Sequence, residues 1–229
     1  MQVLIAQLAG HLASWGEIAP NTQRLSAQTP TLSAVLGIVG ACLGVDREDV
    51  DGQQAMSSGY IVIIESGTDG DALVDFHTSA HGSGGRRIPA SRREELTMPK
   101  IATVPTNREY RQGGYWRVAI SAREGARWTL TDIAEAMCKP KWSPYLGRRS
   151  CPLMLPLAPR VVHAETGAHA LELHHPVGPI GIPSHRHFIR WTEGDIDVIP
   201  QLIVTRRDDP SPRAPRAFLT RRECVIEVT

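Results

Sequence analysis

The chain has 229 residues, of which 41% are hydrophobic and 21% charged, and its formal net charge at pH 7 is +1. This composition is typical of a soluble globular protein with a sizeable core, and a near-neutral total argues against a protein that coats nucleic acid over its whole surface. No apolar run approaches the roughly 20 residues of a membrane-spanning helix, and the N-terminus lacks the features of a secretion signal. We therefore expect a cytoplasmic protein without membrane contact.

The first half of the chain predicts alternating strands and helices. "MQVLIAQL" reads as a strand that is buried on both faces, and a long polar connection follows it over residues 9–30. "PTLSAVLGIVGACLG" predicts a helix, capped by Thr29 or Thr31 and ended by Gly44. The β-branched run "GYIVIIES" and the alternating "YWRVAIS" predict strands, and "TLTDIAEAMCKP" predicts a second helix that ends before Pro140.

A basic insertion separates the second and third predicted strands. It covers roughly residues 76–114, and the segment from His81 to Arg117 carries eight Lys or Arg residues against three Glu. We expect it to be irregular, with one short helix where Ser91 and Glu94 have capping-box spacing. An insertion of this length inside a compact domain is usually functional or disordered.

The order of elements predicts the fold class. Strand, helix, strand, insertion, strand and helix suggest an α+β protein with a ferredoxin-like β-α-β-β-α-β domain, the architecture of the RRM, over residues 1–154. Residues 155–229 predict a smaller β-rich region. Its expected strands are "ALEL", "IDVIPQLIVT" and "ECVIEV", and "RRDDPSPRAPRA" reads as a polar loop between the last two.

The sequence gives no sign of a metal, a cofactor or a catalytic nucleophile. The four cysteines are far apart, so reduced, buried thiols are the better interpretation for Cys42 and Cys138. The histidines at 174, 175, 185 and 187 lack a nearby Cys or carboxylate pair and read as loop residues. There is no G-x-S-x-G elbow, and "GSGG" lacks the Gly-Lys-Ser/Thr ending of a P-loop.

Two stretches suggest contact with RNA. In "SPYLGRRSCPLMLPL", Gly147 lets the backbone turn and two prolines stiffen it, so Arg148 and Arg149 could grip phosphate while Tyr145 stacks on a base. Two solvated arginines on a surface turn are an equally good interpretation. The insertion offers further basic groups beside possible stacking or hydrogen-bonding residues, although its arginines could also pair with Glu94 and Glu95. These are Arg86, Arg87, Arg92, Arg93, Lys100, Arg108 and Arg111, with Phe76, His77 and Tyr110.

Several stretches, in the same order, resemble a known family. They are "LAGHLASWGE", "TPTLSAVLGIVGACLGVDRED", "DFHT", "TNREY" and "KPKWSPYLGRRSCPLMLPL". The chain resembles the CRISPR-associated subunits that bind the 5′ end of the guide RNA, in the type I-E Cascade version called the CasD family. The resemblance implies a ferredoxin-like body with a protruding thumb, here residues 76–114, and together these clamp the 5′ handle of the CRISPR RNA (crRNA).

The resemblance also implies site residues and partners. Ser14, Trp15, Arg24, Tyr145, Arg148 and Arg149 would line the handle groove, with Trp15 and Tyr145 as apolar or stacking surface, and Arg108 would lie in the thumb. The implied partners are the crRNA, the backbone subunit of the filament and the large subunit that recognises the PAM, with target DNA reached indirectly. An alternative is a metal-independent endoribonuclease that processes repeat RNA, as in type I-C relatives, with His77, Lys100 and Tyr110 as candidate catalytic groups.

Overall fold

The computed structural model describes residues 1–19, 22–83, 89–98, 100–173, 187–210 and 218–228. Within them, one nine-stranded and mostly antiparallel sheet has the order β10-β11-β9-β5-β7-β1-β8, and β3 and β6 also pair with β7. A small second sheet pairs β2 with β4. The α+β class is confirmed. The central strands are β5 (Tyr60–Thr68), β7 (Lys100–Ala122) and β1 (Gln2–Ala13), and β8 (Arg160–His163) lies at the edge beside β1.

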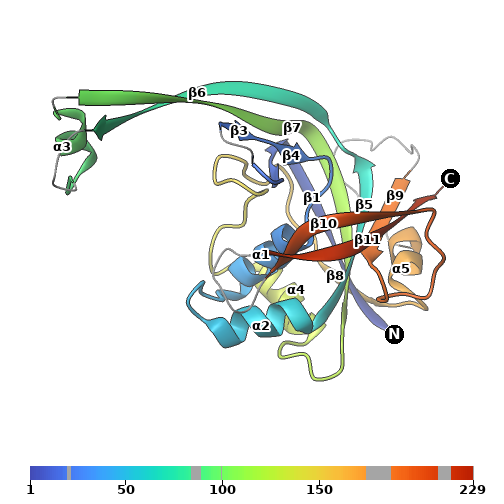
Figure 1. The fold of residues 1–229 in the computed structure, drawn as a ribbon. Helices are drawn as coiled ribbons and strands as arrows, with labels where there is room; N and C mark the ends of the chain where they lie inside the picture. The colour runs from blue at the N-terminus through green and yellow to red at the C-terminus, as the bar shows by residue number, and fades with distance from the viewer. Residues whose placement is uncertain (20–21, 84–88, 99, 174–186, 211–217, 229) are drawn as a thin grey trace.

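Helices cover both faces of this sheet (Figure 1). α1 (Leu32–Leu43), α2 (Val50–Ser58) and α4 (Leu130–Cys138) lie on one face, and α5 (Gly167–Leu173) lies on the other. Side chains of a strand alternate between its two faces, so β1 and β7 contribute to both cores. The core under α1 and α4 contains Leu4, Leu8, Trp116, Val118 and Ile120, and the core under α5 contains Val3, Ile5 and Ala119. The predicted burial of the first strand on both faces is confirmed.

The predicted helix ends are confirmed. The Thr31 side chain accepts a hydrogen bond from the Ala34 N–H, and Gly44 ends α1 in the left-handed conformation with φ 75°. Thr129 caps α4 in a reciprocal capping box with Asp132. α2 was not predicted, because its sequence is polar and lacks a long apolar face. Asp49 caps it by accepting from the Gly52 N–H at 2.9 Å.

The basic insertion is a long hairpin, which corrects the expectation of irregular structure. β6 (Asp71–Ser83) pairs with the first half of β7 from Asp71 opposite Gln112 to Ser83 opposite Lys100. The two strands leave the body of the sheet together and carry the short helix α3 (Arg92–Leu96) at their far end (Figure 1). The predicted cap of this helix is confirmed, because the Ser91 side chain accepts from the Glu94 N–H at 3.2 Å.

The C-terminal strands extend the same sheet. β9 (His187–Thr192) pairs with β5, and β11 (Phe218–Val228) joins β9 to β10 (Leu202–Pro210). Two expectations are wrong here. "ALEL" ends helix α5 instead of forming a strand, and β10 continues through Pro210 into the expected polar loop. The division at residue 154 stays a prediction.

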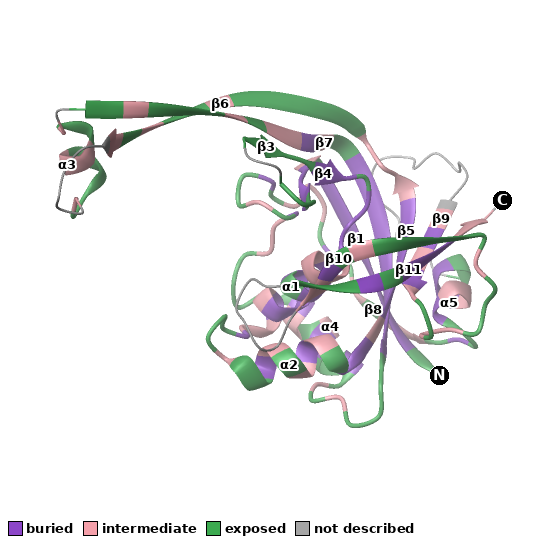
Figure 2. Cartoon of the chain, viewed as in Figure 1, coloured by how far each residue is buried: buried purple, intermediate pink, exposed green. Residues whose placement is uncertain are grey.

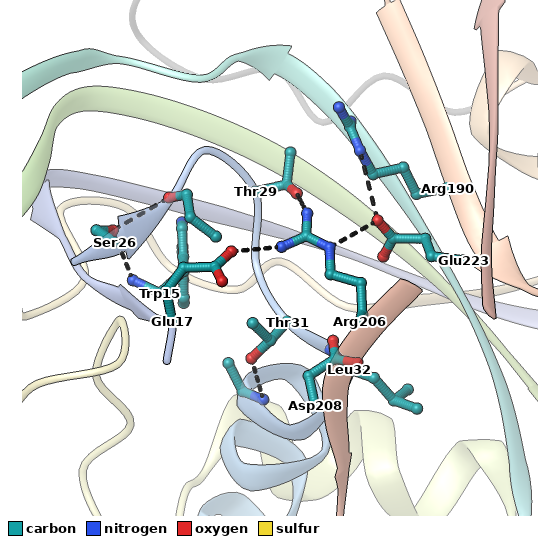
Figure 3. A network of polar contacts seen from close by, with 12 residues as sticks. Trp15, Glu17, Ser26, Thr29, Thr31, Leu32, Arg190, Arg206, Asp208 and Glu223 are labelled. Carbon is teal, nitrogen blue, oxygen red and sulfur yellow. Dashed lines mark hydrogen bonds and ion pairs between the residues drawn. The ribbon is translucent and has the colours of Figure 1, made fainter. Parts of the chain in front are cut away.

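Charged residues of the β10–β11 hairpin tie it to the segment before α1 (Figure 3). Arg206 forms ion pairs with Glu17 at 2.8 Å and Glu223 at 3.0 Å. Asp208 accepts from the Leu32 N–H at 2.8 Å and pairs with Arg221. Asp208, Arg221 and Glu223 are all more than nine-tenths buried, so each charge depends on its partner.

The remaining expectations concern two cysteines and membrane-spanning helices. Cys138 is exposed, because it closes the last turn of α4 on the solvent side, whereas Cys42 is buried as predicted. Burial raises the pKa of the Cys42 thiol to about 11. Among the described residues, no helix combines the length and the apolar character that crossing a membrane requires.

Candidate functional site

Buried neighbouring residues hold the loop that carries Arg148 and Arg149. Leu146 and Cys151 are fully buried, and the Leu146 N–H donates to the Cys151 carbonyl at 2.8 Å. The Cys151 N–H donates to the Arg148 carbonyl at 2.9 Å, which closes a tight turn over residues 148–151. Tyr145, half-buried, forms a bridge with Pro152. The two arginines are therefore presented on a rigid turn.

Gly147 fits this loop against the end of β1. Its φ of 83° lies in the left-handed region, and a Cβ atom there would stand 1.8 Å from the Ser14 carbonyl oxygen. The Ser14 N–H donates to the Leu146 carbonyl at 3.0 Å across the same contact. A side chain at residue 147 is excluded both by backbone conformation and by space. The predicted turn at Gly147 is confirmed.

Arg148 and Arg149 have different surroundings. The Arg148 guanidinium lies over the Tyr110 ring, with 4.8 Å from Cζ to the ring centroid, and its Nη2 donates to the Arg24 carbonyl at 3.3 Å. Its Nη1 is buried and has no acceptor among the described residues. Arg149 is exposed. Arg148 is thus oriented by the protein, whereas Arg149 is free to reach outward.

Two more arginines lie beside this turn, at the base of the β6–β7 hairpin. β3 (Gln23–Arg24) pairs in parallel with β7, which places Arg24 opposite Arg108, and the Asn107 N–H donates to the Thr22 carbonyl at 3.0 Å. Because Arg148 also contacts the backbone of Arg24, three separate segments meet here. We call Arg24, Arg108, Arg148 and Arg149 the basic cluster.

The structure places Ser14 and Trp15 under the site. Both are buried, and the Trp15 ring packs edge-on against Trp116 with centroids 5.0 Å apart and an interplanar angle of 86°. The Ser14 Oγ donates to the Glu109 carbonyl at 3.2 Å. An exposed stacking surface at Trp15 is therefore a wrong expectation, because the core encloses the ring. Tyr110 is likewise buried, under Arg148.

The remaining predicted residues lie along the hairpin. The His77 side chain contacts the Asp75 carboxylate and stands opposite Thr106, whereas Lys100 stands opposite Ser83. At about 3.3 Å a residue, His77 and Lys100 are about 20 Å apart along the strands, and Tyr110 lies about 13 Å from His77 on the other side. The hairpin therefore does not bring these three groups together. Arg86 and Arg87 lie outside the described residues.

Sequence reasoning missed two features, one at the hairpin base and the other at Trp142, whose N–H donates to the Ala41 carbonyl of α1. The Arg111 Nη2 donates to the Ser26 carbonyl at 3.3 Å and pairs with Glu109, which joins the hairpin base to β4 (Ser26–Ala27). β4 in turn pairs with β2 (Trp15–Gly16). Trp142 is 41% exposed, and Lys141 Nζ lies 6.0 Å from the centroid of its ring. An exposed tryptophan beside lysines was a usable signal for a stacking surface.

Metal and thiol chemistry gain no support from the described part of the chain. No group of three or more His, Cys, Asp or Glu residues there could hold a metal ion. Of the histidines considered above, 174, 175 and 185 lie outside the described residues. Burial raises the pKa of the Cys151 thiol, which keeps it in its unreactive protonated form at neutral pH.

Comparisons with known proteins identify the family of the chain. A family model described as CRISPR-associated protein (Cas_Cas5) matches residues 3–226. The chain is 30% identical over 237 residues to the CRISPR system Cascade subunit CasD of Escherichia coli (strain K12), covering 98% of this chain and 95% of that protein.

Solved structures show the same likeness. A chain of a CRISPR RNA-guided surveillance complex superimposes with a TM-score of 0.66 at 25% identity, covering 98% of this chain and 89% of the other. A second structure, described as a Cas protein, has a TM-score of 0.60 at 22% identity, covers 99% of this chain and 93% of the other, and shows the shared fold. The chain belongs to the Cas5 family of CRISPR-associated proteins, and its relatives include a subunit of the Cascade complex.

Proposed function

We propose that this protein is a non-catalytic RNA-binding subunit of a type I-E-like Cascade surveillance complex, in which it holds the 5′ handle of the crRNA for antiviral defence. The observation that carries the proposal is the basic cluster, in which four arginines from three segments meet at the hairpin base. In a chain with a net charge of only +1, such a concentration points to an anionic ligand.

The fold supports the same proposal. The strands β8, β1, β7 and β5 are neighbours in that order and antiparallel, and α1 and α4 pack against them. This is the arrangement expected of a ferredoxin-like, RRM-type domain with β-α-β-β-α-β connectivity. The β6–β7 hairpin would be the thumb. Its base carries Arg108 and Tyr110, which links the thumb to the loop of Arg148.

The two arginines of the loop would have separate tasks. Arg149, being exposed, would contact handle phosphates directly. Arg148 is already held by Tyr110 and by the Arg24 carbonyl, and its buried Nη1 still lacks an acceptor among the described residues. Because the side chain is already ordered, contact between this half-buried residue and an RNA oxygen would cost little entropy. Arginine contacts of this kind give salt-sensitive affinity, whereas base edges and shape give specificity.

The proposed partners are those of a Cascade subunit. They are the crRNA, the backbone subunit at the end of the filament and the large subunit that recognises the PAM, with target DNA reached only indirectly. No metal or cofactor enters the proposal, since binding needs only the protein's own donors.

A metal-independent endoribonuclease is the second candidate. It would need a base near a ribose 2′-OH and a cation near the adjacent phosphate, both within hydrogen-bond reach of the reacting atoms. His77, Lys100 and Tyr110 are spread over the length of the hairpin, at the separations of about 13 and 20 Å given above. This spacing does not support the candidate catalytic set.

The test is binding of labelled repeat RNA to the full chain in EDTA, followed by native gel and filter assays. We expect binding without cleavage, with an affinity that falls steeply as salt rises. Each phosphate contact on a single strand contributes about 0.7 to the slope of log affinity against log salt, so Arg149→Gln should lower that slope by about 0.7. Arg127→Gln, at an exposed position in the turn between β7 and α4, is the matched control. Cleavage to a 2′,3′-cyclic phosphate, or a salt-independent affinity, would refute the proposal.

A further inference from the structure

β10 forms an edge of the nine-stranded sheet, and its two halves differ in how that edge is protected. Among the described residues β10 pairs with β11 alone. Its second half has the features that block pairing with another strand. The register shifts between Arg206 and Asp209, Arg206 and Asp208 are tied into ion pairs, and Pro210 lacks an N–H.

The first half has none of these protections. Residues 202–205 read Leu-Ile-Val-Thr and are all exposed, as the green part of β10 in Figure 2 shows. Leu202 is 58% exposed, and Ile203 and Val204 are 38% and 39% exposed. A regular, apolar edge without charge, proline or bulge is a template for another strand. Because such an edge is an aggregation risk while it is open, we expect a partner to cover it.

We propose that residues 202–205 bind an extended segment of another protein subunit, which adds to β10 as a further strand of the sheet. The inference rests on the proposed function, since it assumes that this chain works inside a multi-subunit complex. Backbone groups on the open side of an edge strand are satisfied by an extended chain and not by a helix. The flanking side chains of Leu202, Ile203 and Val204 then require apolar residues on the incoming segment.

Charge defines one end of that segment. Arg207 is exposed and its Nε donates to the Phe218 carbonyl at 3.2 Å, and it has no ion pair with any described residue. An Asp or Glu just beyond the paired residues of the incoming strand would provide Arg207 with a carboxylate. A second copy of this chain fits less well. Antiparallel pairing of residues 202–205 with themselves places Arg207 opposite Pro200, which supplies neither an N–H nor a negative charge.

The first experiment is hydrogen–deuterium exchange on the full chain in three states: alone, with crRNA, and in the complex reconstituted from crRNA and the Cascade protein subunits. Among residues 202–205, we expect the amides that face the open edge to exchange about tenfold more slowly in the complex, because new backbone hydrogen bonds protect them. RNA alone should not slow them. Unchanged exchange in the complex would overturn the inference. Protection in the free chain that increases with protein concentration would also overturn the inference, because it indicates pairing with a second copy.

The second experiment uses Val204→Lys, which places a charge on the edge without entering the core. We expect the complex to lose one protein subunit, or to bind it at least about tenfold more weakly, while RNA affinity of the isolated chain stays unchanged. Ile199→Lys, at an 89% exposed position before the strand, is the control and should assemble normally. Normal assembly of Val204→Lys would contradict the inference. If the wild-type chain did not bind RNA, the proposed function would be refuted. The inference about β10 would still be decided by subunit retention, which is measured separately.

Discussion

Gly147→Ala tests whether the rigid turn positions the basic cluster. A residue other than glycine in the left-handed conformation costs about 1–2 kcal/mol. The new Cβ would stand 1.8 Å from the Ser14 carbonyl oxygen, a backbone atom that no side-chain rotation can move. The loop must therefore retreat and lose the hydrogen bond from the Ser14 N–H to the Leu146 carbonyl, worth about 1 kcal/mol. We expect the free energy of unfolding to fall by about 2–3 kcal/mol in total.

The matched control is Gly125→Ala. Gly125 has a similar φ of 77°, but a Cβ atom there meets no atom within 4 Å, so this variant carries the backbone strain without the clash. Guanidinium denaturation should therefore show a smaller loss, about 1–2 kcal/mol. Filter binding should show about tenfold weaker RNA affinity for Gly147→Ala alone, equivalent to about 1.4 kcal/mol, because its loop carries Arg148 away from Tyr110. If the two variants unfold and bind RNA alike, the turn does not position the arginines and the reasoning is wrong.

Two further predictions concern stability. Asp208→Ala leaves the Arg221 guanidinium buried with one partner fewer and should lower the free energy of unfolding by about 3–5 kcal/mol in guanidinium. Glu193→Ala, which breaks the exposed pair with Arg222, should cost less than about 1 kcal/mol. Hydrogen bonds from the Thr129 side chain, and to a smaller extent from its backbone, lower the pKa of Asp132 in the folded state. The ionised carboxylate therefore stabilises the fold above the ordinary aspartate pKa, and this contribution is lost as pH falls through the lowered pKa. The stability difference between wild type and Asp132→Asn should therefore vanish on acidification, and a constant difference would exclude the capping carboxylate as its source.

The sequence predicted best those elements whose pattern reflects burial. α1 has apolar residues at helical spacing with Thr31 and Gly44 at its ends, and its observed bounds follow them. The alternation of Trp116, Val118 and Ile120 with Ala119 identified the two faces of β7 correctly, because one core lies on each side. In both cases the local pattern and the tertiary environment agree.

The long hairpin and α5 were missed for different physical reasons. Both faces of the projecting strands are largely exposed, so apolar and polar residues need not alternate, and Phe76 and Val74 are each 66% exposed. Pairing of β6 with β7 is a non-local property that the pattern does not encode. In α5, the short apolar run "ALEL" fits a strand and a helix equally well, and packing of Ala170 and Leu171 against the sheet decides it.

The stiff basic turn could be predicted from the sequence, but the surroundings of its side chains could not. Glycine and prolines around Arg148 indicated a stiff basic turn, and the structure has one. Whether an aromatic residue nearby is a stacking surface or a support depends on which elements cover it. Trp15 is enclosed by the core and Tyr110 lies under Arg148, so both orient the site instead of lining it.

Three arginine doublets of this chain, 148–149, 206–207 and 221–222, combine a protein-bound and an exposed side chain, which composition does not reveal. On extended or tightly turned backbone, consecutive side chains point in opposite directions, so one arginine of a doublet faces the protein and the next faces outward. Arg206 and Arg221 are held by buried carboxylates, whereas their neighbours Arg207 and Arg222 are exposed. Arg148 and Arg149 repeat the division, with Tyr110 in place of a carboxylate. In each of these three doublets composition counts two equal charges, but the first arginine is held in place by the protein and only the second is exposed.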